Sequence, residues 1–159
     1  MQPTSVAAGQ EDRRWFLATL VVEISVQSES RNVVHRNLFL ISAHSPEEAY
    51  SKAIGLGHQG EVMYENPAGS AVRHTFRGIS QLDELVDDEP VDGAELAFEQ
   101  RTGVSEEDIQ ALILPKDQLH VFNPPAPGRT DVPDYSSREV LVTVLEEISE
   151  GARHTGERE

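Results

Sequence analysis

Histidines are the first residues to consider for chemistry, because the chain has six of them and no cysteine. A histidine metal site usually places two ligands on one face of an element, for example four residues apart on a helix. No pair here has that spacing within a predicted helix, so we expect neither a metal nor another cofactor. His44, Tyr64 and His74 form a candidate ligand cluster if strand pairing brings them together. The sequence favours the simpler interpretation that they lie on the surface or are hydrogen-bonded in the core.

Carboxylates are concentrated between Gln81 and Asp108, where eleven acidic side chains accompany a single basic residue, Arg101. The densest part, called the acidic cluster below, consists of Asp83, Glu84, Asp87, Asp88 and Glu89. The spacing of a calcium-binding loop is missing, and Pro90 interrupts the run. Catalysis by two carboxylates needs surroundings that separate their pKa values, which a solvated loop does not provide. We interpret the acidic cluster as a candidate surface for a basic protein partner, with a plain solvated loop as the alternative.

Motifs for nucleophilic or phosphate chemistry are absent from the sequence. It has no G-x-S-x-G turn, no G-x-G-x-x-G loop and no P-loop, and the lack of cysteine excludes thiolate catalysis. The formal net charge of -15 opposes binding to nucleic acid or to anionic membranes, since both need clustered Lys and Arg. No segment has the roughly 18 consecutive apolar residues of a membrane span. These features predict a cytoplasmic protein that is not an enzyme.

Two strand patterns form the centre of the predicted fold. Residues 15–26 are apolar at every even position from 16 onward, as expected for a strand with one buried face. A second apolar run, residues 33–43, follows a short polar connection, so an antiparallel hairpin is expected. A turn centred near Ser30 places Leu20 opposite Leu40.

With this register, the odd-numbered face of the hairpin is also apolar. It carries Val21, Phe39 and Ile41, which we name as candidate partner-binding residues. So apolar a face is rarely left in water. We expect another part of the chain, a second copy or a partner protein to cover it.

The helix after the hairpin has the clearest local signals. Ser45 is a predicted N-cap, Pro46 suits the first helical position, and Glu48 completes a capping box by reaching back to the Ser45 amide. Gly55 and Gly57 are interpreted as the signal that ends the helix. Its apolar stripe is expected to cover the even face of the hairpin.

Three segments together resemble a known family: WFLATLVVEI, LFLISAHSPEEAYSKAIGLG and VRHTFRGISQLDEL. With Tyr64 and an A-x-S-x-E-E-A helix start at Ala43, they are similar to the bacterial family called domain of unknown function 4288, over residues 14–122. The family's name assigns no activity, so the resemblance implies no functional residues. Phe39 departs from the polar outer face expected of the pattern, and the Pro-rich C-terminal extension is particular to this chain.

The remaining sequence predicts five more elements and a divided C-terminal part. Strands are expected over 59–65, 71–78, 94–100 and 118–122, and a short helix over 105–114. The predicted organisation is a disordered lead-in (1–13), a domain (14–122), a Pro-rich linker (123–135), an amphipathic helix (136–150) and a polar tail (151–159). This helix is expected to fold back onto the odd face or to bind another molecule.

The resulting fold class is α+β: an antiparallel sheet of four to six strands in ββα-ββ-βα order, with a helix on one face and an appended C-terminal helix. The first functional hypothesis is an acidic protein-binding module, in one form an immunity- or antitoxin-like protein. The competing hypothesis is a small-molecule-binding domain or an unrecognised enzyme with a pocket near Tyr64, Arg73 and His74. A homodimer through the odd face is the third.

Overall fold

The computed structural model describes residues 13–125, 131–140 and 142–143. The elements are β1 (Arg14–Val26), β2 (Val33–Ala43), α1 (Pro46–Gln59), β3 (Val62–Glu65), β4 (Ala71–Glu84), α2 (Glu106–Ala111) and a 3-10 turn (Lys116–Gln118). Nearly all of the predicted lead-in, the polar tail and most of the predicted C-terminal helix lie outside the described residues.

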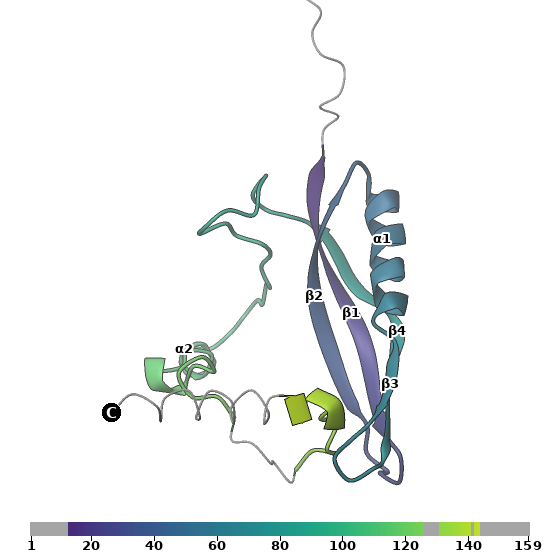
Figure 1. Ribbon diagram of the computed structural model, residues 1–159. Coiled ribbons are helices and arrows are strands. Elements are labelled where there is room, and N and C mark those ends of the chain that lie inside the picture. Colours follow the sequence, from purple (N-terminus) through teal and green to yellow (C-terminus); the bar gives the residue numbers. More distant parts are fainter. Residues whose placement is uncertain (1–12, 126–130, 141, 144–159) are drawn as a thin grey trace, which may run out of the picture.

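The four strands form one antiparallel sheet in the order β2-β1-β4-β3. β1 lies in the centre and pairs along its length with both β2 and β4. The long strands of the sheet twist strongly, so the sheet curls along its length (Figure 1). α1 lies along one face, called the helix face below, and the opposite face is called the outer face (Figure 1). The predicted α+β class is confirmed.

The pairing of β1 with β2 shows that the predicted register is wrong. Leu20 lies opposite Asn37 and not opposite Leu40. The chain turns earlier than Ser30, at Gln27–Ser28, where Ser28 takes a φ of 73° that most residues avoid. The partner of Leu20 is therefore three residues away from the predicted one, and an odd shift turns every side chain of a strand to the opposite face.

The new register exchanges the two faces of β2. Phe39 and Ile41 face α1, where Ile41 is buried and Phe39 packs against the core. Leu38 and Leu40 take the outer face in their place, together with Val21 from β1. Phe39 is therefore no departure from the pattern of the family, because it does not lie on an outward-facing position.

The main core lies between α1 and the sheet. Its buried members are Phe16, Ala18, Leu20, Ile41, Ala43, Ala49 and Ala53. Four of these seven are alanines, and their small side chains let the helix backbone approach the strands closely. The prediction that the helix covers the even positions of β1 is confirmed.

A second, smaller core lies on the same face beyond the end of α1. Ile24, Val26 and Val72 are buried there, and Tyr135 from the C-terminal segment packs against them. Tyr135, which belongs to the predicted linker, thus covers the helix face. Most of the predicted C-terminal helix lies outside the described residues, so its docking onto the odd face stays a prediction. Residues 138–140 are helical, and the rest of the predicted helix beyond 143 lies outside the described residues.

The start of α1 follows the sequence signals more closely than its end. Ser45 Oγ accepts from the Glu48 amide at 3.1 Å, as predicted. The Glu48 carboxylate reaches back one residue further than expected and accepts from the backbone N–H of His44 at 2.9 Å. The helix continues through Gly55 and Gly57 to Gln59, so the predicted stop at those glycines is wrong.

Gly57 is required for packing rather than for ending the helix. A Cβ at this position would lie 2.5 Å from the ring of Phe76 on β4, closer than real side-chain contacts allow. We expect Gly57→Ala to destabilise the protein by about 1–2 kcal/mol, because overpacking outweighs the gain in helix propensity. Urea unfolding followed by circular dichroism measures this difference.

Gly55 supplies the matched control on the same helix. A Cβ there would meet no atom within 4 Å, so Gly55→Ala adds helix propensity without a clash. We expect it to stabilise the protein by about 0.5–1 kcal/mol. Effects of the same sign in the two variants would contradict the close approach of α1 to Phe76.

Two of the other predicted strands are absent, and two predicted elements end at different residues. Residues 94–100 form no strand, and α2 stops at Ala111 instead of 114. Gln118 ends the 3-10 helix, and residues 119–122 form turns in place of a strand. β4 extends to Glu84, so the first two residues of the acidic cluster belong to the sheet. Pro90 and Gly93, which has a φ of 85°, interrupt the extended backbone between β4 and residue 94.

Candidate protein-binding surface

The acidic cluster gathers where β4 ends beside the start of β1. A hollow of about 450 Å³ is lined by Arg13, Arg14, Trp15, Glu84, Leu85, Asp87, Asp88 and Glu89. Asp83 lies apart from this hollow, on the outer face opposite Leu17. The structure therefore brings four of the five predicted acidic residues together, and Asp83 extends their charge onto the sheet.

Contacts within the chain partly neutralise and fix this cluster. Arg14 forms an ion pair with Glu84 at 2.9 Å, across the two central strands. Asp87 Oδ2 accepts from the backbone N–H of Glu95 at 2.8 Å, which closes the loop that carries the remaining carboxylates. Asp88 and Glu89 are exposed beside this loop. They are the members best placed to meet a basic side chain from outside.

The outer face of β2 exposes a row of large apolar side chains. Val34 is 55% exposed, Leu38 64% and Leu40 43%, and all three lie at even positions of the strand. Val21 of β1 is half-buried beside them. We call Val34, Leu38 and Leu40 the apolar row. The sequence interpretation missed these residues because the run from 33 to 43 is apolar on both sides, and only the register decides which side is buried.

β2 is also an edge strand, since β1 is its only neighbour in the sheet. Among the described residues, no backbone hydrogen bond joins another segment to its free edge. An edge strand with exposed apolar side chains is a site where another chain can bind. On this face, Arg36 donates to Gln81 across β1 at 3.1 Å and interrupts the apolar row with a polar group.

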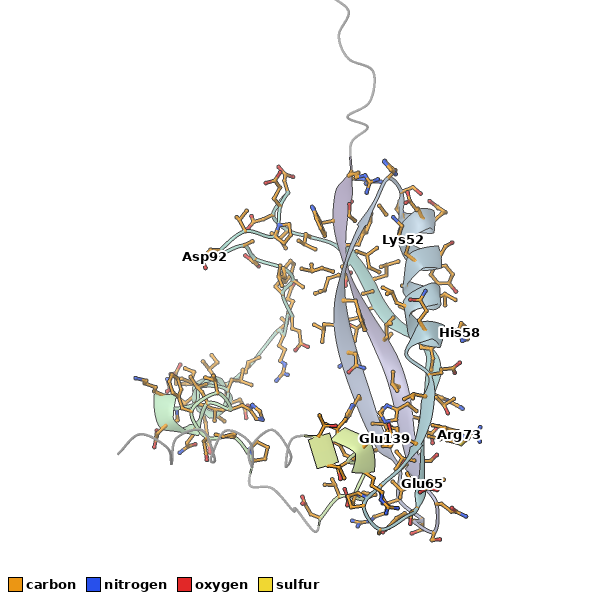
Figure 2. The ribbon with its side chains drawn as sticks, viewed as in Figure 1. Lys52, His58, Glu65, Arg73, Asp92 and Glu139 are labelled. Atoms are coloured by element: carbon orange, nitrogen blue, oxygen red, sulfur yellow. The ribbon has the colours of Figure 1, made fainter. Side chains whose placement is uncertain are left out.

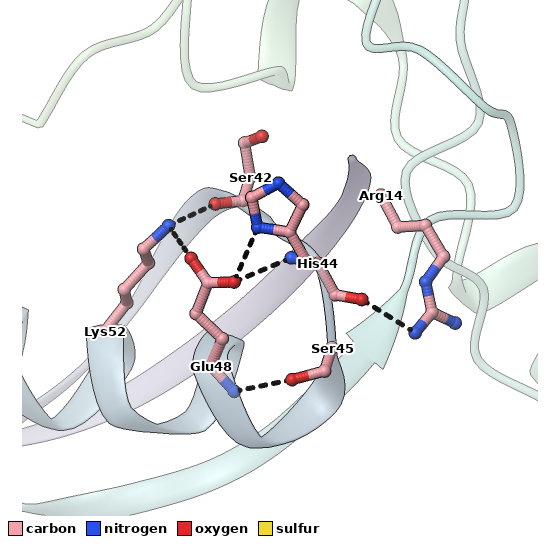
Figure 3. A network of polar contacts seen from close by, with 6 residues as sticks. All are labelled: Arg14, Ser42, His44, Ser45, Glu48 and Lys52. Carbon is pink, nitrogen blue, oxygen red and sulfur yellow. Dashed lines mark hydrogen bonds and ion pairs between the residues drawn. The ribbon is translucent and has the colours of Figure 1, made fainter. Parts of the chain in front are cut away.

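A polar network at the start of α1 fixes the connection between β2 and the helix (Figure 3). The Glu48 carboxylate contacts Lys52 Nζ at 2.6 Å and His44 Nδ1 at 2.9 Å. Lys52 Nζ also donates to the carbonyl of Ser42 at 2.7 Å. The Lys52 hydrogen bond, followed by the His44 backbone N–H, lowers the pKa of Glu48 to about 2. Glu48 is therefore ionised near neutral pH, and the network holds the backbone instead of exchanging protons.

The candidate ligand cluster is not assembled as predicted. Tyr64 and His74 meet, with the hydroxyl 3.0 Å from Nε2, but His44 bonds Glu48 at the other end of α1. Arg73 lies opposite Met63 on β3, with its guanidinium 3.6 Å from the Met63 sulfur. A hollow of about 330 Å³ is lined by Arg73 and His74 but not by Tyr64. Two of the three residues named for a small-molecule pocket therefore line one hollow, and binding of a small molecule there stays a prediction.

The surroundings of Tyr64 and His74 favour the neutral forms of both side chains. Burial lowers the pKa of His74, and the nearby His35 lowers it further. Burial also raises the pKa of Tyr64, with the neighbouring Tyr135 as the next cause. In the described part of the chain, no group of three or more His, Asp or Glu side chains is arranged to hold a metal ion.

The segment that follows Leu85 is largely exposed. Residues 86–125 include no buried residue, and α2 lies away from the sheet (Figure 1). The segment nevertheless carries large apolar side chains, among them Phe98, Leu112, Ile113, Val121 and Phe122. Asp92 lies on the part that leaves the sheet (Figure 2). No helix that the structure describes is long and apolar enough to cross a membrane.

The fold and this surface define an α+β protein with one helix on an antiparallel sheet and an exposed apolar outer face. The family model Domain of unknown function (DUF4288) matches residues 15–98, more than half of the chain, so the protein belongs to this family. The match contains the whole sheet, α1, the acidic cluster and the apolar row, and it ends before α2. No curated protein and no solved structure matches the chain.

Proposed function

We propose that this protein is a cytoplasmic, non-enzymatic module that binds a protein partner through the outer face of its sheet. The observation that carries the proposal is the apolar row, three large side chains exposed on one face of an edge strand. Burying one such side chain completely contributes about 1.5–3 kcal/mol, so a partner that covers all three gains substantial affinity. A second copy of this chain is the alternative occupant.

The charge of the surface supports a basic partner. The acidic cluster lies at the end of β4, and Asp83 brings negative charge onto the outer face itself. Opposite charges at the rim of an interface mainly increase the association rate, whereas the buried apolar centre determines how slowly the complex dissociates. An immunity- or antitoxin-like protein that inhibits a basic toxin is one form of this function that fits such a surface.

The test separates the contribution of the apolar row to partner affinity from that of the acidic cluster. The tagged chain is used to capture partners from the source cell at low and moderate salt, and the bound protein is then purified. We expect the double variant Leu38→Ser/Leu40→Ser to bind it at least tenfold more weakly, through faster dissociation. Neutralising the exposed carboxylates in Asp88→Asn/Glu89→Gln is expected to slow association several-fold and to reduce its dependence on salt.

Met63→Ser is the matched control for the apolar centre. Met63 is 64% exposed on the same face, but it lies on β3 at the opposite edge of the sheet. Its substitution should leave the affinity unchanged. An unchanged affinity in the Leu38/Leu40 variant, with the fold intact by circular dichroism, would remove the outer face as the binding surface. Sedimentation of the purified protein shows whether the occupant is a second copy.

A further inference from the structure

The helix face of the sheet holds a peptide-like segment in the part that α1 does not cover. Residues 131–135 run across it, and they are separated by about 60 residues or more from the strands they touch. These residues contact the sheet as a bound peptide would. The sheet contacts their backbone carbonyls and two of their side chains, and they do not pair with any strand. The segment lies outside the residues matched by the family model, while the strands beneath it lie within them.

Three side chains from the sheet side recognise the backbone of this segment. Arg31 donates to the carbonyl of Asp131 at 2.9 Å, and Asn66 donates to the carbonyl of Asp134 at 2.9 Å. The Tyr64 hydroxyl donates to the carbonyl of Tyr135. Carbonyl groups are present in every peptide, so these three donors select an extended backbone of fixed length and not a particular sequence.

Two side chains of the segment add sequence selectivity. Pro133 is buried. The Tyr135 ring packs on the second core and stands edge-on to His35, with 5.5 Å between ring centres. The side chains of Val132 and Asp134 are exposed, so they contribute little to recognition. The selected pattern is a proline followed two residues later by a tyrosine.

Other contacts of the sheet fix the orientation of two of these donors, Asn66 and Tyr64. Asn66 is only 3% exposed, and its Oδ1 accepts from the Ser70 amide at 2.9 Å, which points Nδ2 toward the segment. Because the single hydroxyl hydrogen of Tyr64 goes to a carbonyl, His74 must donate to Tyr64 through Nε2. Without a peptide, Asn66 Nδ2 and the Tyr64 hydroxyl would lose their acceptors at a partly buried site, which is costly.

We propose that this groove is a binding site for an extended Pro-x-Tyr peptide, which residues 131–135 of the chain occupy and which a partner's peptide of the same type can take in their place. Tethering gives the chain's own segment an effective concentration near millimolar, so a free peptide competes poorly while the segment is intact. The site is separate from the outer face, because the two lie on opposite sides of the sheet. A result that contradicts the proposed partner surface therefore leaves this proposal unaffected, and the reverse also holds.

The test uses the full chain with its own segment weakened. A fluorescent peptide of sequence DVPDYSS, corresponding to residues 131–137, is added to the wild type and to Tyr135→Ala. We expect saturable binding to Tyr135→Ala and at least tenfold weaker binding to the wild type, measured by fluorescence polarisation. The same peptide with alanine in place of tyrosine should not bind. Adding Asn66→Ala to the Tyr135→Ala chain should abolish binding.

A second variant guards against a folding defect in Tyr135→Ala. Pro133→Gly weakens the segment but keeps the tyrosine ring over the second core, and it should also bind the peptide more tightly than the wild type. Circular dichroism and thermal unfolding establish that each variant is folded. No saturable binding to either folded variant would overturn the proposal, as would equal binding to the wild type and both variants.

Discussion

Ile41→Ala is expected to lower the free energy of unfolding by about 2–5 kcal/mol, whereas Leu40→Ala should cost less than about 1 kcal/mol. Ile41 is 4% exposed in the core under α1, so its truncation leaves a cavity between the strands and the helix. Leu40 is 43% exposed on the outer face, and its truncation leaves no enclosed space. Urea unfolding of both variants measures the difference directly.

The comparison tests the register of β1 and β2, because the two residues are neighbours in sequence and differ only in the face they take. A hairpin that turned at Ser30 would bury Leu40 and expose Ile41, and the order of the two costs would be reversed. Similar costs would indicate that both faces are covered, for example by a stable dimer. Ile41→Ala should leave partner affinity unchanged in the folded fraction, which separates packing from binding.

The limits of the sequence analysis are clearest in this hairpin. Its strands, the Ser45 cap and the helix that covers β1 follow from local patterns, and all three are present. The faces of β2 do not follow, because residues 33–43 have apolar side chains at both even and odd positions. Register then depends on turn geometry, and no sequence signal marked Ser28 as the residue with positive φ. Two of the candidate residues, Phe39 and Ile41, were consequently assigned to the wrong face.

Gly57 shows a different limit. A glycine near a helix end usually signals termination, and the local sequence cannot distinguish this role from a close approach to another element. The ring that excludes a side chain at position 57 belongs to Phe76, nineteen residues further along the chain. The acidic cluster was found from composition alone, whereas the hollow with Trp15 at its edge required β1 and β4 to be paired.

The groove for residues 131–135 had no sequence signal, because every contact that forms it is distant. Tyr64 and Tyr135 are 71 residues apart, and the tyrosine and proline of the segment lie in a stretch interpreted only as a linker. The sheet thus has two surfaces with different chemistry: an outer face with the apolar row, and a helix face that α1 and the segment share. On the outer face the apolar row of β2 is exposed, whereas Leu17 and Thr19 of β1 are buried. The groove on the helix face is filled.

Asn66→Ala is expected to lower the free energy of unfolding by about 2–4 kcal/mol, a large effect for a polar residue in a turn. Its side chain serves two partners at once, accepting from the Ser70 amide and donating to the Asp134 carbonyl. Removal leaves the Ser70 amide unpaired at the hairpin and frees the C-terminal segment. Asn32→Ala is the matched control, since Asn32 is exposed and its side chain donates to the Glu23 carboxylate at 2.7 Å; its cost should stay below about 1 kcal/mol.

A double-mutant cycle with Tyr135→Ala separates the two roles of Asn66. Once Tyr135 no longer anchors the segment, the bond to Asp134 contributes little, and Asn66→Ala should then remove only the contact to Ser70. We expect a coupling of about 1–2 kcal/mol between the two substitutions, within the range found for residues that share a network. Limited proteolysis within residues 131–135 should become faster in each single variant. Strict additivity, together with unchanged proteolysis in Asn66→Ala, would mean that Asn66 supports the hairpin alone and does not hold the segment.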